Sequence, residues 1–159
     1  MMLHDMKHED IIGKYKEVTS KLHNSGIRRI LYTDLETPYP DGKLIVSTTT
    51  PDGIITHVNQ SFIEMSGYSE QELIGVPHSI LRHPDMPPAA FKDLWDTVKK
   101  GEKWQGFVKN LRKDGGYYWV KATVIPNIRM GKLVSYSSIR RKPSRTNVEN
   151  CIKLYPTMF

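Results

Sequence analysis

The sequence predicts an α+β fold in which a five-stranded antiparallel sheet carries short helices on one face. Two short β-branched runs come first, a block of helical sequence follows them, and three longer strand-like runs come last. Strands that flank a block of helices are typical of α+β domains with an antiparallel sheet. With 159 residues, the chain is long enough for one such domain with a buried core and some extension.

The composition is that of a folded domain. Hydrophobic residues make up 38% and charged residues 25% of the chain. No apolar run reaches the ~18 residues of a membrane helix, and the charged N-terminus lacks the apolar stretch of a signal peptide. We therefore expect a cytoplasmic protein without direct membrane insertion, either free or peripheral to a membrane receptor. The single cysteine, Cys151, excludes an internal disulfide and a cysteine-based metal cluster.

Positive charge is concentrated toward the C-terminal end. The formal net charge is +6, and residues 101–145 hold eleven Lys or Arg against Glu102 and Asp114. Such a surface attracts anions, from phosphates to acidic proteins, although solvated sheet edges give the same pattern. We expect no nucleic-acid partner, because no helix-turn-helix, zinc-finger or RNA-binding motif accompanies the charge.

The N-terminal residues predict a helical extension. Apolar residues recur there at spacings of three and four, which indicates a helix over residues 8–31: Ile11, Ile12, Tyr15, Val18 and Leu22. Asn24-Ser25-Gly26 is a break signal, and the Pro-rich stretch 37–42 is a loop. The expected parts are a helical extension 1–40, a domain 41–142 and a C-terminal tail 143–159. An apolar helical stripe needs a partner, which makes a homodimer through this helix an open option.

Turn and cap signals delimit the elements of the domain. The expected strands are 44–49, 54–58, 104–112, 117–125 and 132–140. The expected helices are 60–67, 69–75 and 88–101. Asn59 can cap the first of these helices, and Ser69 with Glu72 forms a capping box for the second. Pro126 ends the fourth strand or kinks it.

Two strings make the domain resemble a known family, the flavin-binding PAS domains of Aer-type aerotaxis receptors and of stand-alone energy-taxis sensors. They are Arg82-His83-Pro84-Asp85-Met86-Pro87 and Trp104-Gln105-Gly106-Phe107-Val108-Lys109-Asn110. The resemblance covers residues 42–142. It implies a PAS fold, non-covalently bound FAD, and relay of the redox state to a chemotaxis signalling partner of the HAMP or methyl-accepting type. The membrane anchor and signalling domain of such receptors have no counterpart here, so the chain is expected to dock as a stand-alone sensor or to be part of a longer receptor.

The resemblance also implies site residues. Asn110 offers a donor and an acceptor to the pyrimidine edge of a flavin, and Trp104 can stack on the ring or pack in the core. Arg82, His83 and Asp85 fall where the family has residues critical for FAD, and they suit a pyrophosphate and a ribose. The same three residues also suit a self-contained turn in which Asp85 pairs with Arg82 and caps the next helix.

Three further residues are weaker candidates. His78 extends the Arg82–Asp85 group, Ser138 can offer a hydroxyl to the ring, and Asn59 suits a helix cap better than a ligand. The Arg82–Asp85 group favours FAD over FMN because it offers contacts to a second phosphate and ribose.

Other functions remain open at this point. A cofactor-free interaction module would fill its pocket with side chains. A haem sensor would need an axial ligand such as His78 or His83. A cysteinyl–flavin photosensor is not expected, because Cys151 lies in the tail, and no catalytic constellation indicates an enzyme. The outer sheet face, including Trp119, is the expected surface for a signalling partner.

Overall fold

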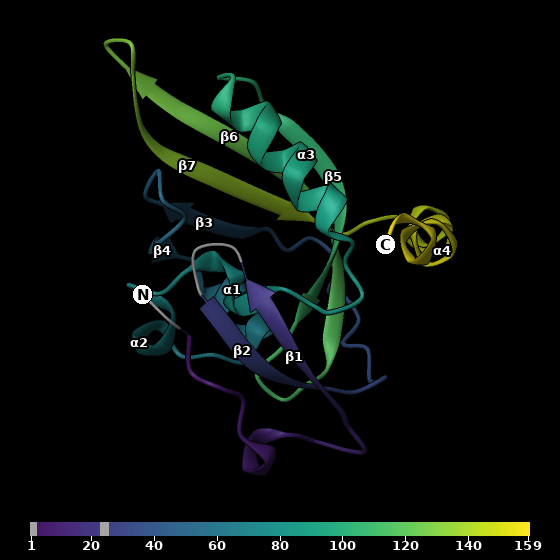
Figure 1. The fold of residues 1–159 in the computed structure, drawn as a ribbon. Helices are drawn as coiled ribbons and strands as arrows, with labels where there is room; N and C mark the ends of the chain where they lie inside the picture. Colours follow the sequence, from purple (N-terminus) through teal and green to yellow (C-terminus); the bar gives the residue numbers. More distant parts are fainter. Residues whose placement is uncertain (1–2, 23–25) are drawn as a thin grey trace.

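The computed structural model describes residues 3–22 and 26–159. Its main sheet has the strand order β4-β3-β7-β6-β5, and every neighbouring pair is antiparallel. The strands are β3 (Ile45–Thr49), β4 (Ile55–Val58), β5 (Trp104–Leu111), β6 (Tyr117–Arg129) and β7 (Lys132–Arg141). The predicted α+β architecture with a five-stranded antiparallel sheet is therefore confirmed (Figure 1).

The block between β4 and β5 supplies the helices. It holds α1 (Gln60–Ser66), α2 (Glu70–Leu73), the 3-10 helix η2 (His78–Leu81) and α3 (Pro88–Lys99). Figure 1 shows α3 running along β5 and β6. The main core lies between these helices and the sheet, where Phe62, Leu73 and Tyr118 are fully buried. Among the described residues, no helix has both the length and the apolar character needed to cross a membrane.

The cap signals of the helical block are confirmed. Asn59 Oδ1 accepts from the Phe62 N–H at 3.1 Å, which caps α1. Ser69 and Glu72 form the reciprocal capping box of α2. α1 ends at Gly67, whose φ of 78° is a left-handed conformation that glycine adopts without strain.

β6 continues through Pro126 to Arg129, four residues beyond the expected end at residue 125. Pro126 pairs with Tyr136 of β7, while the pairing of β6 with β5 ends opposite Trp104, at Val124. On its other side Pro126 therefore has no neighbouring strand that needs its missing N–H. A bulge follows at Asn127/Ile128, so the strand is irregular there but not terminated.

The predicted helix over residues 8–31 is wrong. A short 3-10 helix, η1 (His8–Asp10), is followed by an antiparallel hairpin of β1 (Lys16–Leu22) and β2 (Gly26–Tyr32). Gly13 and Gly26 have φ values of 88° and 73°, which an α-helix cannot accommodate. Of the expected break, Asn24 and Ser25 lie outside the described residues.

The hairpin is docked on the domain rather than left with a free apolar stripe. Ile30 and Leu31 are 1% exposed and pack with Met6 and Leu111. The buried Arg28 guanidinium donates to the Ile80 carbonyl at 3.1 Å and approaches the Tyr68 hydroxyl oxygen at 3.2 Å. The homodimer that was an option through an N-terminal helix therefore loses its structural basis.

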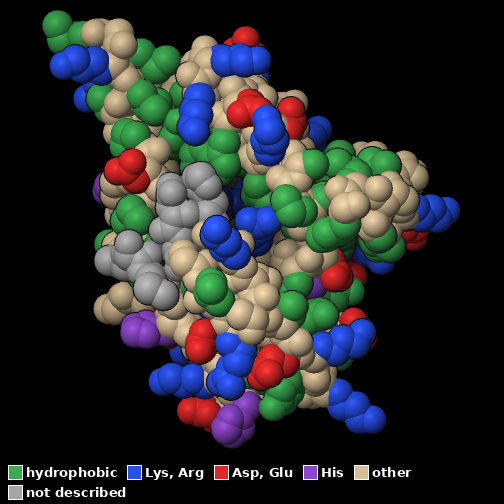
Figure 2. Space-filling model, in the orientation of Figure 1, with side chains coloured by type: hydrophobic (Ala, Val, Ile, Leu, Met, Phe, Trp, Pro, Cys, Tyr) green, Lys and Arg blue, Asp and Glu red, His purple; other side chains and the backbone are tan. Residues whose placement is uncertain are grey.

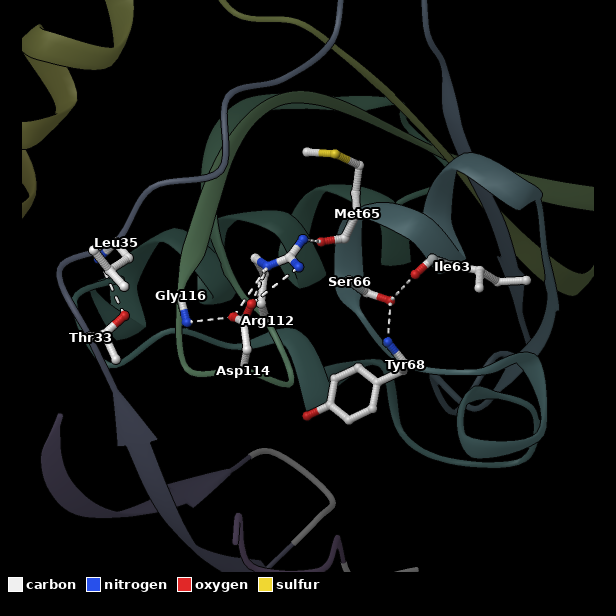
Figure 3. A network of polar contacts seen from close by, with 9 residues as sticks. All are labelled: Thr33, Leu35, Ile63, Met65, Ser66, Tyr68, Arg112, Asp114 and Gly116. Atoms are coloured by element: carbon white, nitrogen blue, oxygen red, sulfur yellow. Dashed lines mark hydrogen bonds and ion pairs between the residues drawn. The ribbon is translucent and has the colours of Figure 1, made fainter. Parts of the chain in front are cut away.

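A polar network fixes the β5–β6 turn against α1 (Figure 3). The Arg112 side chain contacts the Met65 carbonyl and forms an ion pair with Asp114 at 3.2 Å. The Asp114 carboxylate accepts from the Gly116 N–H at 2.9 Å, and the Lys113 N–H donates to the Ser66 carbonyl at 2.9 Å. These contacts hold one end of β5, the strand that carries Asn110, in a fixed position relative to the helical block.

A C-terminal helix covers part of the outer sheet face. α4 (Arg145–Leu154) and the 3-10 helix η3 (Tyr155–Met158) follow β7, where the sequence predicted a C-terminal tail with room for one or two helical turns. Trp119 is 4% exposed and packs with Val148 and Cys151 of α4. Trp119 is therefore not an exposed partner contact, and that expectation is wrong.

Candidate functional site

A cavity lies between the helical block and the inner face of the sheet. Its empty volume is about 1030 Å³, including the solvent at its mouth. Apolar walls come from both layers: Phe91, Leu94, Trp95, Trp104, Val108 and Val124. Polar side chains from β5, β7 and the η2 region complete it: Asn110, Ser138, Arg140, His78 and Arg82. A mostly apolar pocket with a few convergent polar groups is typical of a small-molecule site.

The cavity brings together five of the eight residues that the sequence singled out. Asn110, Trp104, Arg82, His78 and Ser138 all line it. The other three do not: His83 lines a second cavity, whereas Asp85 and Asn59 line neither.

Asn110 lines the cavity from β5. It is 4% exposed on β5, opposite Tyr118 of β6. A backbone bridge between Asn110 and Arg82 ties the irregular segment after η2 to this strand. The backbone of Asn110 is thus held by two elements that are distant in sequence.

Trp104 serves both as a core residue and as a cavity wall. Its indole N–H donates to the Asp93 carboxylate of α3 at 2.8 Å. The ring lies over Gly106, where a built Cβ would fall 2.4 Å from Trp104 Cη2. Gly106 is thus the space that allows the indole to lie flat along β5.

Arg140 is the cavity residue that sequence reasoning missed. It is 3% exposed, its Nη2 approaches the Ser47 hydroxyl oxygen at 3.2 Å, and Nη1 has no hydrogen-bond partner in the described residues. Burial lowers the pKa of Arg140 to about 10, so the guanidinium stays charged at neutral pH. The alternation that puts Tyr136 and Ser138 on the inner face of β7 also puts Arg140 there, and this was the available signal.

His78 is held neutral beside that cation. Burial, together with the charge of Arg140, lowers the pKa of His78 to about 3. Arg140 Nη2 lies 2.6 Å from His78 Nε2. Because a guanidinium can only donate, Nε2 accepts and the ring proton sits on Nδ1.

The Arg82–Asp85 group is not the self-contained turn that the sequence allowed. The Arg82 guanidinium lies 4.4 Å from the centroid of the Phe91 ring, and Asp85 pairs with Lys109 at 2.8 Å instead of with Arg82. The residue that precedes α3 is Pro87, and no side chain caps this helix. Asp85 is 57% exposed, so its carboxylate faces solvent as much as protein.

His83 is buried among aromatic rings. Its ring packs edge-on against Tyr32 of the hairpin and Tyr117 of β6, with centroids 5.5 and 5.9 Å away. Burial, with a further effect of the Lys109 charge, lowers the pKa of His83 to about 3. Its Nδ1 accepts from the Asp85 N–H at 3.0 Å.

The Asn59 side chain has a structural role, because its carboxamide is already hydrogen-bonded to backbone groups. In addition to capping α1, its carboxamide accepts from the Val46 N–H at 3.1 Å and donates to the Leu44 carbonyl at 2.9 Å. We expect Asn59→Ala to lower the free energy of unfolding by about 2 kcal/mol, because a cap and two further hydrogen bonds are lost. Chemical denaturation measures this effect. The matched cap variant Ser144→Ala, at the exposed N-terminus of α4, should cost about 1 kcal/mol or less; equal losses would contradict the role given to Asn59.

Comparison with known proteins agrees with this geometry. Residues 55–140 match the protein family described as the PAS fold. A 126-residue stretch is 47% identical to the aerotaxis receptor of Escherichia coli K12, covering 79% of this chain and 25% of the receptor. The chain belongs to the PAS family and is homologous to that receptor.

More distant relatives share the domain. Phototropin-2 of Oryza sativa is 33% identical over 104 residues, which cover 64% of this chain and 11% of phototropin-2. Among solved structures, a light-oxygen-voltage domain studied with a flavin analogue aligns with a TM-score of 0.63 at 22% identity, covering 72% of this chain and 88% of that one. The dark-state light-oxygen-voltage domain of aureochrome1 gives a TM-score of 0.63, at 22% identity and 72% and 86% coverage. At this identity the likeness shows the fold, and the chain spans a quarter or less of the two named relatives.

Proposed function

We propose that this PAS domain binds FAD non-covalently in the cavity and signals the redox state of the flavin to a chemotaxis partner by protein–protein contact. The homology to an aerotaxis receptor supports the signalling context. The sensing unit in this proposal is the sheet and helical block of residues 41–142, located in the cytoplasm. It acts as a sensor and not as an enzyme.

The main support for the proposal is the buried Arg140 guanidinium, whose Nη1 has no hydrogen-bond partner among the described residues. A buried cation without a carboxylate partner is costly unless another group satisfies it. Arg140 forms no ion pair in the described part of the chain, and its Nη1 lacks a partner while its side chain lines the cavity. The carbonyl and ring-nitrogen edge of a flavin is an acceptor that suits this donor.

Different cavity residues would contact different parts of a flavin ring. Asn110 offers an acceptor and a donor to the pyrimidine edge, Arg140 offers a charged donor, and Ser138 offers a hydroxyl. Trp104 and Trp95 provide aromatic walls. Bound FAD supplies the electron-transfer chemistry, and the positive charge of Arg140 favours any added negative charge on the ring.

The signal route that we propose runs through β5. Asn110 and Trp104 face the cavity from this strand. On the same strand the Phe107 carbonyl accepts from the Tyr155 hydroxyl of η3 at 2.6 Å. A shift of β5 on flavin reduction would therefore reach the C-terminal helices directly.

The two alternatives fit the cavity less well. A cofactor-free module would fill its pocket with side chains, whereas here a cavity lined by residues of both layers stays open between the helical block and the sheet. Haem would need a histidine nitrogen as axial ligand. His78 Nε2 already accepts from Arg140, and His83 does not line this cavity. Cys151 packs beside Trp119 rather than at the cavity, which disfavours a cysteinyl–flavin photosensor.

The decisive experiment is an absorption spectrum of the purified protein, air-oxidised and then reduced with dithionite. We expect blue and near-ultraviolet flavin bands that bleach on reduction, and FAD as the extracted cofactor. A sharp Soret band would favour haem. A protein that stays colourless after incubation with FAD would contradict the proposal and favour the interaction module.

Asn110→Ala tests the ring site. We expect FAD affinity to fall about tenfold, because one or two hydrogen bonds to the flavin edge are lost. Titration of the apoprotein with FAD measures it. Asn127→Ala removes a carboxamide of β6 that bonds Ser135 and Ser137 outside the cavity, and should leave affinity unchanged. Equal affinities in the two variants would contradict the assignment of Asn110.

A further inference from the structure

The turn between β6 and β7 forms an exposed tip at one end of the molecule. Arg129 pairs with Lys132 across the hairpin, so Met130 and Gly131 make a two-residue turn. Figure 1 shows this turn projecting beyond β3 and β4. The tip is therefore a narrow, convex part of the protein surface.

Met130 is an unusual residue for such a turn. Met130 and Gly131 both have positive φ values, 50° and 77°, which is the type I′ geometry that Asn and Gly favour. Among the described residues, Met130 is the one non-glycine with a positive φ, a conformation that costs a methionine steric strain. Its side chain is 101% exposed, so no contact within the protein offsets this cost. The strained, exposed methionine points to a role in contact with another surface.

Two further exposed apolar residues lie on the same hairpin. Ile128 is 51% exposed and Val134 is 44% exposed. A Cβ built on Gly101 would fall 3.4 Å from Ile128 Cδ1, so the end of α3 borders the hairpin here. We call Ile128, Met130 and Val134 the apolar tip. Apolar side chains gathered on a projecting surface indicate an interaction site.

Basic residues accompany the apolar tip. Arg129 and Lys132 lie directly opposite each other, and like charges in this position destabilise a hairpin. More cations come from the end of α3 and the loop after it. All five are exposed, and none forms an ion pair with a described residue: Lys99, Lys100, Lys103, Arg129 and Lys132.

The surface around the tip is positive overall. The same two segments, residues 96–103 and 128–134, hold two acidic residues, Asp96 and Glu102. Asp96 is already paired with Lys92 at 2.6 Å. Figure 2 shows hydrophobic side chains at this projecting end, with Lys and Arg side chains beside them. The tip thus combines exposed apolar groups with cations that lack partners in the described chain, and an anionic surface would satisfy both.

A membrane with anionic lipids suits this combination better than a protein partner. A specific protein interface needs roughly 800 Å² from each partner, whereas a two-residue turn is narrow and convex. A lipid surface yields to such a tip. Apolar side chains can reach the boundary between headgroups and acyl chains, while long basic side chains keep their charges among the lipid phosphates.

We propose that the β6–β7 turn docks on the surface of a membrane that contains anionic lipids. Met130 enters the boundary below the headgroups, and Arg129 and Lys132 contact lipid phosphates. The contact is peripheral, because only side chains of the tip leave water. It goes beyond the proposed function and does not depend on a bound flavin.

Vesicle sedimentation with the full chain tests the proposal. Vesicles of phosphatidylcholine with about one third phosphatidylglycerol supply the anionic surface, and pure phosphatidylcholine supplies the neutral one. We expect about tenfold or tighter binding to the anionic vesicles. Most of this binding should be lost between about 0.1 M and about 0.5 M salt, because salt screens exposed charges.

Two variants separate the apolar from the charged contribution. Met130→Asn suits the left-handed turn better than methionine, so the fold should be retained while vesicle binding weakens about fivefold or more. Arg129→Gln combined with Lys132→Gln should weaken binding about tenfold or more, since each basic residue near an anionic surface contributes roughly fivefold.

Matched controls lie near η1, at the end of the molecule away from the tip (Figure 1). Ile12→Asn removes an apolar side chain that is 63% exposed. Lys7→Gln combined with Lys14→Gln removes two exposed cations. Both controls should bind anionic vesicles within about twofold of wild type, because neither changes the tip.

Three outcomes would overturn the proposal. The first is wild-type binding to anionic vesicles that is no tighter than binding to neutral ones. The second is an equal loss in Met130→Asn and Ile12→Asn. The third is wild-type protein that binds no vesicle but forms a dimer in analytical ultracentrifugation that Met130→Asn abolishes, which would assign the tip to a second copy of the chain. Because vesicle binding is measured independently of flavin absorption, failure of either proposal leaves the other standing.

Discussion

Arg140→Met is expected to weaken FAD binding by about 10- to 100-fold, because a charged hydrogen bond contributes roughly 1.5–3 kcal/mol. The donor concerned is Nη1, which has no hydrogen-bond partner among the described residues and belongs to a side chain that lines the cavity. Methionine keeps an apolar side chain of similar reach but offers no donor. Titration of the apoprotein with FAD gives the affinity.

The same substitution should change the stability of the apoprotein by less than about 1 kcal/mol, since two effects oppose each other. Removing a buried cation relieves its desolvation cost, whereas Ser47 and His78 lose a hydrogen-bond partner. Loss of flavin without loss of stability is the signature of a ligand contact and not of a structural residue. The control is Arg141→Met on the exposed neighbouring position of β7, which should change neither quantity. If Arg140→Met bound FAD within twofold of wild type, the proposed contact between the Arg140 guanidinium and the flavin would be wrong.

The strands and the helical block could be predicted because their signals are local. Turn glycines and prolines, the capping box at Ser69 and the helical spacing from Phe91 to Val98 each act within a few residues. Local signals of this kind could not show that residues 16–32 form a hairpin and not a helix. Val18 and Leu22 fit a helical stripe and also one face of a strand, and long-range contacts such as that of Arg28 with Tyr68 decide between them.

The candidate site shows the same division. Asn110 and Trp104 lie on one strand, so their common face follows from alternation. Arg140 was missed because a charged residue near a strand end is usually solvated. Its burial depends on Ser47 and His78, which are 93 and 62 residues away in sequence. The partner of Asp85 is likewise Lys109, 24 residues later, and the spacing within the Arg82–Asp85 string holds no sign of it.

Acid is expected to destabilise the protein well above the pH at which carboxylates titrate. His78 is buried neutral with a pKa lowered to about 3, whereas an unfolded chain gives histidine a pKa near 6.5. Between these values the unfolded state binds more protons than the folded state, so the free energy of unfolding falls as the pH falls. The contribution of His78 is fully present above about pH 6.5. At pH 5 roughly 2 kcal/mol of it is lost.

Denaturation curves at pH 7 and pH 5 measure this loss. Burial shifts the pKa of His83 in the same direction, so the wild-type loss should exceed that of His78 alone. Carboxylates contribute little in this window because they titrate near pH 4 and below. His78→Gln removes one titrating group and should flatten the dependence by about 2 kcal/mol between the two pH values, whereas His57→Gln on the exposed surface of β4 should not. Identical pH dependence in wild type and His78→Gln would show that the His78 ring is not held neutral by burial. The environment assigned to His78 in the cavity wall, with a neutral imidazole accepting from a charged Arg140, would then be wrong.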